Sequence, residues 1–223
     1  MSINIQKGNM YGFVTHTWNT VKGKCPHDCS YCYMKRFPQP ELHFDEKELK
    51  TNLGEGNFIF IGSSCDMFAD KIPKEWIEKT LEHCCKYPDN KYLFQSKNPH
   101  RFKYFINGYP KNTILCSTIE TNRIDLFNYS GGTQFTNRTY ELKNLSKLYY
   151  MPIIVTVEPI IDFNLLQFVE ILKEVNPFQI NIGSDSGNNH LPEPSKEKIL
   201  ELISELEKFT VVHQKQNLKR LLK

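Results

Sequence analysis

The sequence predicts an α/β fold, a partial TIM-like (β/α)6 barrel of mostly parallel strands with helices on the outside. Three observations support this prediction. Short, continuously apolar runs recur along the chain, as expected for strands that are buried on both faces. Helical patterns alternate with these runs, which is typical of repeated βα units. About six such units can be counted, fewer than a complete barrel contains, so an open barrel fits the count.

Each element follows from its local pattern. The expected strands are 12–18, 57–62, 91–96, 112–119, 152–158, 178–183 and, more weakly, 209–213. The expected helices are 45–53, 73–87, 99–106, 139–150, 162–175 and 194–209. Pro73 and the pair Pro194–Ser195 are helix-start signals. The glycine-bearing stretch 128–138 is expected to be a surface loop. A doubly wound open sheet stays the alternative, because periodicity alone does not separate it from a barrel.

Composition and charge set broad limits. The 223 residues fit a single domain, 1–223. A hydrophobic content of 39% with 24% charged residues fits a soluble globular protein. The N-terminal MSINIQKGNM has no apolar signal region and no run is long enough to span a bilayer, so we expect a cytoplasmic protein with no membrane partner. The net charge of +3 neither requires nor excludes a nucleic-acid partner.

The cysteines indicate a metal site. Seven cysteines without a secretory signal favour reduced thiols over a disulfide framework. Cys25, Cys29 and Cys32 have the spacing C-x3-C-x2-C. No fourth cysteine follows at a matching short spacing, because the others are scattered at Cys65, Cys84, Cys85 and Cys116.

Two kinds of metal site fit three clustered cysteines. Iron–sulfur clusters usually take four cysteine ligands, so three would leave one iron of a [4Fe–4S] cluster open to a small molecule. A structural zinc ion takes a closed set of four ligands, and either His27 or His43 is available to complete such a set. The zinc site would make the chain a non-catalytic, metal-stabilised binding protein.

The stretch CPHDCSYCY, residues 25–33, resembles the signature of the radical S-adenosylmethionine (radical SAM) superfamily, C-x3-C-x-aromatic-C, with Tyr31 as the aromatic residue. The family's cysteine loop follows the first barrel strand, and here the run 12–18 precedes it. The resemblance implies that Cys25, Cys29 and Cys32 hold a [4Fe–4S] cluster whose open iron binds S-adenosylmethionine. An electron from a flavodoxin-type or ferredoxin-type donor then cleaves the cofactor to methionine and a 5′-deoxyadenosyl radical, which abstracts hydrogen from a substrate.

The resemblance also implies cofactor contacts after the second and third strands. After the second, many members have a Gly-Gly-Glu segment that meets the methionine amino group. This chain has GSSCDMFAD there, so Ser63 and Asp66 replace that segment by position, a version similar to that of spore photoproduct lyase and its relatives. After the third, Ser96 and Lys97 are placed to reach the methionine carboxylate, since lysine and a carboxylate form a charge-assisted pair. A solvated loop lysine is the alternative for Lys97.

Polar residues also follow the next strands. Thr118 and Glu120 share one face of the fourth strand and are placed to bind the ribose or the carboxylate of the cofactor. Thr156 and Glu158 repeat this spacing on the fifth strand, and Asp185 follows the sixth. We therefore expect a polar rim at the strand ends, with Glu158 among the cofactor-binding residues.

The resemblance leaves the substrate open. From about residue 12 to 190 the motifs resemble a short, phage-associated radical SAM group of unknown function. Together with the similarity to spore photoproduct lyase, this suggests nucleic acid or a nucleotide as substrate. Cys65 is a candidate catalytic hydrogen donor, as a cysteine is in that lyase, although a small buried hydrophobe is the commoner role of a free cysteine. A radical SAM fold that serves a partner protein is a further alternative.

Overall fold

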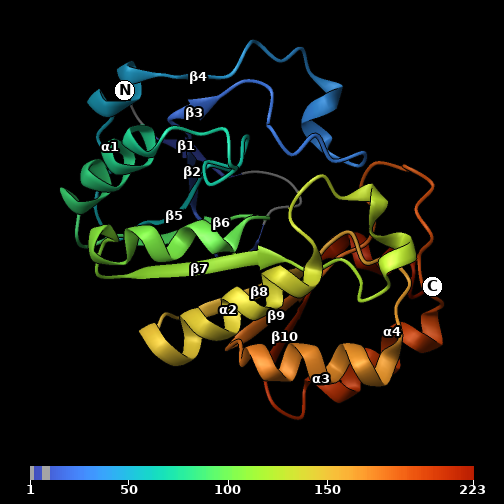
Figure 1. Ribbon diagram of the computed structural model, residues 1–223. Helices are drawn as coiled ribbons and strands as arrows, with labels where there is room; N and C mark the ends of the chain where they lie inside the picture. The colour runs from blue at the N-terminus through green and yellow to red at the C-terminus, as the bar shows by residue number, and fades with distance from the viewer. Residues whose placement is uncertain (1–2, 7–10) are drawn as a thin grey trace.

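A sheet that is parallel except at one edge runs through the molecule (Figure 1). The structure is a computed structural model and describes residues 3–6 and 11–223. Within these residues the main sheet has eight strands in the order β1-β2-β5-β6-β7-β8-β9-β10. Their bounds are β1 Asn4–Ile5, β2 His16–Trp18, β5 Phe58–Ile61, β6 Lys91–Gln95, β7 Thr113–Thr118, β8 Ile153–Val157, β9 Gln179–Ile182 and β10 Val211–Gln214.

The pairing confirms the predicted fold class. From β2 to β10 every strand pairs in parallel with the next strand in this order, and only β1 is antiparallel, to β2. The order does not reverse as it would in a doubly wound sheet, so the alternative architecture is excluded. Each of the seven expected strands is present. The two-residue strands β1, β3 (Val21–Lys22) and β4 (His43–Phe44) were not predicted, because so short a strand has no readable periodicity.

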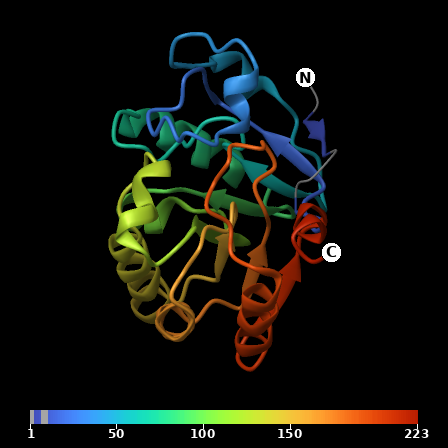
Figure 2. The same cartoon turned by 90° about the vertical axis from the view of Figure 1, so that its right-hand side faces the viewer.

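Helices cover the outer face of the sheet (Figure 2). The α-helices are α1 Lys74–Cys85, α2 Phe135–Tyr149, α3 Leu165–Val175 and α4 Lys196–Leu206. The segments expected as helices at 45–53 and 99–106 form the 3-10 helices η2 and η3 instead. The 3-10 helices of the described residues are η1 Tyr33–Arg36, η2 Glu46–Lys50, η3 Pro99–Gly108, η4 Ile124–Tyr129 and η5 Gln216–Arg220.

The surface-loop prediction for 128–138 was wrong in its second half. Helix α2 begins at Phe135, and Arg138 in its first turns is fully buried. The buried face of this helix includes Arg138 and Glu141 beside Leu142 and Leu145. Because charged residues occupy buried positions, the apolar spacing that marks a helix start was hidden until further along the chain.

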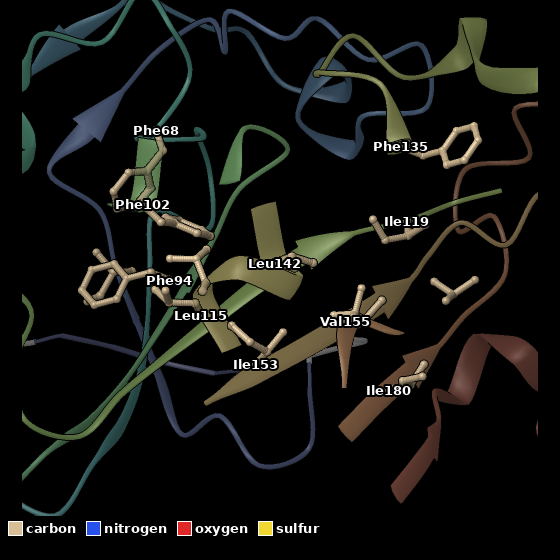
Figure 3. Packing of buried hydrophobic residues seen from close by; sticks show 14 of the residues in the cluster. Phe68, Phe94, Phe102, Leu115, Ile119, Phe135, Leu142, Ile153, Val155 and Ile180 are labelled. Atoms are coloured by element: carbon tan, nitrogen blue, oxygen red, sulfur yellow. The ribbon is translucent and has the colours of Figure 1, made fainter. Parts of the chain in front are cut away.

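Apolar residues fill both sides of the sheet. The larger core lies between the sheet and the helices, and Figure 3 labels some of its members: Phe68, Phe94, Phe102, Leu115, Ile119, Phe135, Leu142, Ile153, Val155 and Ile180. A smaller cluster packs on the inner side: Tyr11, Val14, Phe60, Leu93, Cys116 and Ile154. Alternate residues of β7 and β8 supply the two sides, as the pleat requires. The polar residues that follow the strands are therefore left at the carboxyl edge.

The cysteine loop leaves the barrel through a narrow neck. Strands β3 and β4 pair on either side of residues 23–42, and Lys24 N–H donates to the Pro40 carbonyl at 3.0 Å. Gly23 has a φ of +98° and a Cβ there would overlap the backbone of Glu41, so only glycine fits this neck. In the described part of the chain, no helix is long and apolar enough to cross a membrane.

Candidate functional site

A cavity of about 1210 Å³ lies between the cysteine loop and the carboxyl ends of the strands. This is the edge at which parallel α/β barrels build their sites. The cavity lining includes ten of the residues expected from the sequence: Cys25, Cys29, Tyr31, Cys32, Ser63, Cys65, Asp66, Lys97, Thr118 and Glu158. Segments far apart in the chain thus meet at one surface. Glu120 is 1% exposed and lies behind this lining.

Two tight turns within the cysteine loop reverse the direction of its backbone. Asp28 N–H donates to the Cys25 carbonyl at 3.2 Å, and Cys32 N–H donates to the Cys29 carbonyl at 3.2 Å. Asp28 has a φ of +46°, a conformation that aspartate tolerates better than most residues. Cys29 is buried, whereas Cys25 and Cys32 are half-buried. The turns therefore bring three thiols to the same cavity from eight consecutive residues.

The arrangement of the three thiols can be compared with the two kinds of metal site expected from the sequence. Among residues 3–6 and 11–223, no group of three or more His, Cys, Asp or Glu side chains is arranged around a point where one metal ion would sit. A cubane cluster binds each cysteine at a different iron, so its ligands need to face one cavity without meeting at one point. The histidines named for zinc are also engaged, His27 with Asp66 and His43 with the Glu41 carbonyl.

Cys65 lies beside the first cysteine of the loop. It is 2% exposed, and a hydrogen bond between the two thiols lowers the pKa of Cys25 and raises that of Cys65. A thiolate is the form in which cysteine binds metal. Cys65 therefore stays a protonated thiol at the cavity wall, next to a side chain that is favoured as a thiolate.

Asp66 connects three segments at the cavity. Its Oδ2 accepts from Ser96 Oγ at 2.9 Å and from Lys97 N–H at 2.8 Å, and lies 2.8 Å from His27 Nε2. Its Oδ1 accepts from Phe68 N–H at 2.9 Å. Burial would raise the pKa of Asp66, but these hydrogen bonds and the His27 charge lower it, while Asp66 raises the pKa of His27 against the opposing effect of burial. The carboxylate thus ties the cysteine loop to the ends of β5 and β6.

Lys97 lies at the centre of a charged network. Its Nζ donates to Glu120 Oε1 and to Tyr31 Oη, each at 2.5 Å, and lies 4.9 Å from the centre of the Tyr31 ring. The Tyr31 hydroxyl in turn donates to Glu120 Oε1. Arg138 Nη1 donates to Glu120 Oε2 at 2.9 Å. The aromatic residue of the cysteine motif is thereby held by the lysine and the glutamate that follow two different strands.

The network sets the protonation states of its members. Burial would raise the pKa of Glu120, but the charges of Arg138 and Lys97 hold it well below its usual range. Burial and the Glu120 charge raise the pKa of Tyr31 well above its usual value. Lys97 remains 17% exposed at its side chain. Of the two cations around Glu120, Lys97 is therefore the one that reaches the cavity.

A second ion pair faces the cavity from the next strand. Lys215, just beyond β10, donates from Nζ to Glu158 Oε2 at 2.5 Å and lies 4.8 Å from the centre of the Tyr11 ring. Asn217 Nδ2 donates to Glu158 Oε1 at 2.9 Å. A Cβ on Gly183 would lie 2.7 Å from Glu158 Oε1. The glycine at the end of β9 therefore leaves room for the carboxylate.

The remaining expected residues have mainly local partners. Ser63 Oγ and Ser64 N–H both donate to Asn19 Oδ1 at 3.2 Å, which fixes the turn after β5 to the segment after β2. Thr118 Oγ1 accepts from Gln95 Nε2 at 3.2 Å. These contacts hold Ser63 and Thr118 at the cavity wall.

The carboxylates expected to form one rim divide into three situations. Asp185 lines the cavity but closes its own loop by accepting from Gly187 N–H at 2.8 Å, from Asn189 Nδ2 at 2.6 Å and from Asn189 N–H. Glu158 lines the cavity with its ion-paired partner, and Glu120 is buried behind it. The rim is therefore less uniform than the strand-end pattern suggested.

Three site residues were missed or misjudged from the sequence. Arg138 was assigned to a surface loop. Lys215 was not chosen as a site residue, although it comes directly after the predicted strand 209–213. His27 was considered only as a zinc ligand. The strand-end rule, applied once more to β10, would have found Lys215, whereas nothing local indicates that Arg138 is buried.

Comparisons with known proteins support the fold. No protein-family model and no curated protein matches the sequence. A cysteine-to-serine mutant of spore photoproduct lyase matches with a TM-score of 0.69 at 12% identity, over 95% of this chain and 79% of that one. A mutant of that lyase with bound AdoMet and dinucleoside spore photoproduct has a TM-score of 0.68 at 11% identity, over 96% and 80%. Streptococcus suis SuiB bound to precursor peptide SuiA has a TM-score of 0.62 at 9% identity, over 89% and 48%. Both are radical SAM enzymes, and at such identities the likeness is one of fold.

Proposed function

We propose that the chain is a radical SAM enzyme, one domain over residues 1–223, that binds a [4Fe–4S] cluster and S-adenosylmethionine. One observation carries the proposal: the three cysteines of a single loop line the same cavity as the polar residues that follow the strands of a partial barrel. When bound, such a cluster supplies the electron that cleaves the cofactor to methionine and a 5′-deoxyadenosyl radical. The fold shared with two radical SAM enzymes is consistent with this. Membership of the phage-associated group stays a prediction.

The side chains suggest how the cofactor is held. Lys97 lines the cavity and contacts Tyr31 of the cysteine motif, and it pairs with the methionine carboxylate in this proposal. Glu120 is a positioning residue, since it touches Lys97 and lies behind the lining. Ser63, Thr118 and Glu158 supply polar contacts from the other walls of the cavity.

Cys65 is proposed as the hydrogen donor. Its thiol lies at the cavity wall beside Cys25 and its raised pKa keeps it protonated. Donation would move one hydrogen atom from Sγ to a carbon radical of the substrate and leave a sulfur radical. That sulfur radical would regain a hydrogen atom from 5′-deoxyadenosine if the cofactor is regenerated, or from an external thiol if it is consumed.

The proposed substrate is nucleic acid or a nucleotide. The proposed source of the electron that reduces the cluster is a flavodoxin-type or ferredoxin-type protein. A similar fold has been solved with a dinucleoside photoproduct, and another with a precursor peptide. The zinc-stabilised binding protein, which needs a fourth ligand such as His27, is the alternative that metal analysis distinguishes.

Anaerobic purification with iron, sulfide and zinc analysis tests the proposal. Wild-type protein should contain about four iron and four sulfide per chain after reconstitution. Cys29→Ala should lose this content, whereas the matched control Cys84→Ala, at a buried position of α1, should keep it. Stoichiometric zinc without iron or sulfide in the wild type, or equal iron loss in both variants, would contradict the assignment.

A further inference from the structure

A short segment after η4 packs directly on the cysteine loop. The covering segment, residues 129–133, follows β7 and lies with the cysteine loop at the same end of the sheet (Figure 1). Ser30 donates to the Tyr129 carbonyl from both N–H and Oγ, each at 3.1 Å. Two further residues along, Gly131 N–H donates to Cys29 Sγ at 3.3 Å. The segment therefore contacts the middle cysteine of the motif through its backbone.

Glycine is required for this contact. A Cβ built on Gly131 would overlap the carbonyl oxygen of His27, and one built on Gly132 would overlap the Lys97 side chain. Two adjacent glycines thus let the covering segment approach both the cysteine loop and the lysine that we place at the cofactor. Neither contact was expected for a stretch assigned to the surface.

Arg138 anchors the covering segment to the barrel. Its Nη2 donates to Ser130 Oγ at 2.8 Å and its Nε donates to the Thr133 carbonyl at 2.5 Å. From the other side of the same guanidinium, Nη1 donates to the Thr118 carbonyl at 2.8 Å and to Glu120. Thr133 also donates from N–H and Oγ1 to the Lys97 carbonyl, at 3.1 and 2.8 Å. One buried cation and one threonine therefore fix the segment to the ends of β7 and β6.

We propose that the covering segment tunes and positions the cluster, with the Gly131 amide as a hydrogen-bond donor to the Cys29 sulfur and Arg138 as its positioning residue. The inference rests on the proposed function, because it assumes a cluster at Cys29. An N–H donor to a ligating sulfur stabilises the more negative, reduced cluster and so raises the reduction potential. The segment thus links the ease of cluster reduction to the network around Lys97 and Glu120.

The hydrogen bond can be detected without any substitution. Wild-type protein labelled with nitrogen-15 glycine, reconstituted and reduced, should show a nitrogen-15 coupling in pulsed electron paramagnetic resonance, with an exchangeable proton that deuterium replaces. Gly131→Ala, labelled in the same way, should lose that coupling because its Cβ forces the two loops apart. A reduced cluster with no glycine nitrogen coupling in the wild type would overturn the proposal.

Redox titration supplies the second measurement. In Gly131→Ala the ratio of reduced to oxidised cluster at a fixed potential should fall about threefold, as expected for losing one weak hydrogen bond to a charged acceptor. The control Gly108→Ala, where the added Cβ meets only Leu81 Cδ1 at 3.7 Å, should keep the wild-type potential. Arg138→Lys, which cannot reproduce the guanidinium fork, should shift the potential in the same direction as Gly131→Ala.

The outcomes separate the two proposals. If the reconstituted wild type contains no iron–sulfur cluster, the proposed function fails. If the cluster is present and Gly131→Ala, with full iron content, has the wild-type potential, the covering segment does not tune it. Should Gly131→Ala not fold, the nitrogen-15 measurement on the wild type still decides.

Discussion

Glu120 and Glu158 follow neighbouring parallel strands with the same local sequence, Thr-x-Glu, yet they occupy opposite situations. The Glu120 side chain is 1% exposed and is held by Arg138, Lys97 and Tyr31. The Glu158 side chain is 17% exposed and faces the cavity beside Lys215. The two carboxylates differ because their cationic partners come from different parts of the fold. Arg138 comes from α2, outside the sheet, whereas Lys215 follows β10, the last strand of the same sheet.

A strand-end carboxylate therefore takes its role from a distant partner. A buried guanidinium makes Glu120 part of the framework that presents Lys97, because removing Glu120 would leave the buried Arg138 without a carboxylate partner. Lys215 is itself largely buried, with 9% of its side chain exposed, but its partner Glu158 still faces the cavity. The following predictions test this contrast.

The largest effect is expected for the stability of Glu120→Gln. This change leaves Arg138, which is fully buried, without its carboxylate partner, and breaking such a pair costs about 3–5 kcal/mol in the free energy of unfolding. The matched change Glu158→Gln removes the charge of a carboxylate that still faces the cavity, and should cost less, about 1–3 kcal/mol. Urea unfolding of both variants measures the difference, and similar losses would remove the distinction between the two carboxylates.

Cofactor affinity should depend strongly on Lys97. Lys97→Met removes the proposed charge-assisted bond to the methionine carboxylate and should weaken S-adenosylmethionine binding by about 10-fold to 100-fold. Calorimetry on the cluster-loaded protein measures this, with iron content as the control for the cluster. An affinity within error of the wild type would show that Lys97 serves only the Glu120 network.

The contribution of Glu120 to the free energy of unfolding should be lost at acidic pH. Its pKa is held below its usual value in the folded state, so the stability that it provides is complete above the unfolded-state pKa of 4.5 and is lost as the pH falls below it. From that point the wild type should lose up to about 1.4 kcal/mol per pH unit more than Glu120→Gln. Urea midpoints between pH 6 and pH 3 test this, and parallel profiles would contradict it.

The smallest effect is expected at Glu158. Glu158→Gln should weaken S-adenosylmethionine binding by about threefold to tenfold, the value of one polar contact. Iron content should stay unchanged, because Glu158 is held by Lys215 and Asn217 at the far end of the sheet, beyond β10. A loss larger than that of Lys97→Met would reverse the order of the two sites.

The fold could be predicted because its determinants are local. The runs at 57–62 and 152–158 are mostly apolar and form the interior strands β5 and β8. Cys25, Cys29 and Cys32 were found for the same reason, since their spacing is contained in eight residues. The strand-end rule likewise brought Lys97 and Glu158 to the cavity.

The pairings in the site could not be predicted because they join distant segments. His27 and Asp66 are 39 residues apart, and Glu158 and Lys215 are 57 apart. Arg138 looked like a polar loop residue because its burial depends on a carboxylate supplied by β7. Charge at a buried position has no signature in hydrophobic periodicity, so the start of α2 and the covering segment were both hidden.

The most direct test of the central claim is 5′-deoxyadenosine formation by the reconstituted protein with S-adenosylmethionine and dithionite. Wild-type protein should release 5′-deoxyadenosine and methionine in equal amounts, and Cys29→Ala should release neither. The control Cys84→Ala should match the wild type, since Cys84 is buried in α1, away from the cavity lining. A wild-type protein with full iron and sulfide content that binds S-adenosylmethionine but yields no 5′-deoxyadenosine would contradict the account.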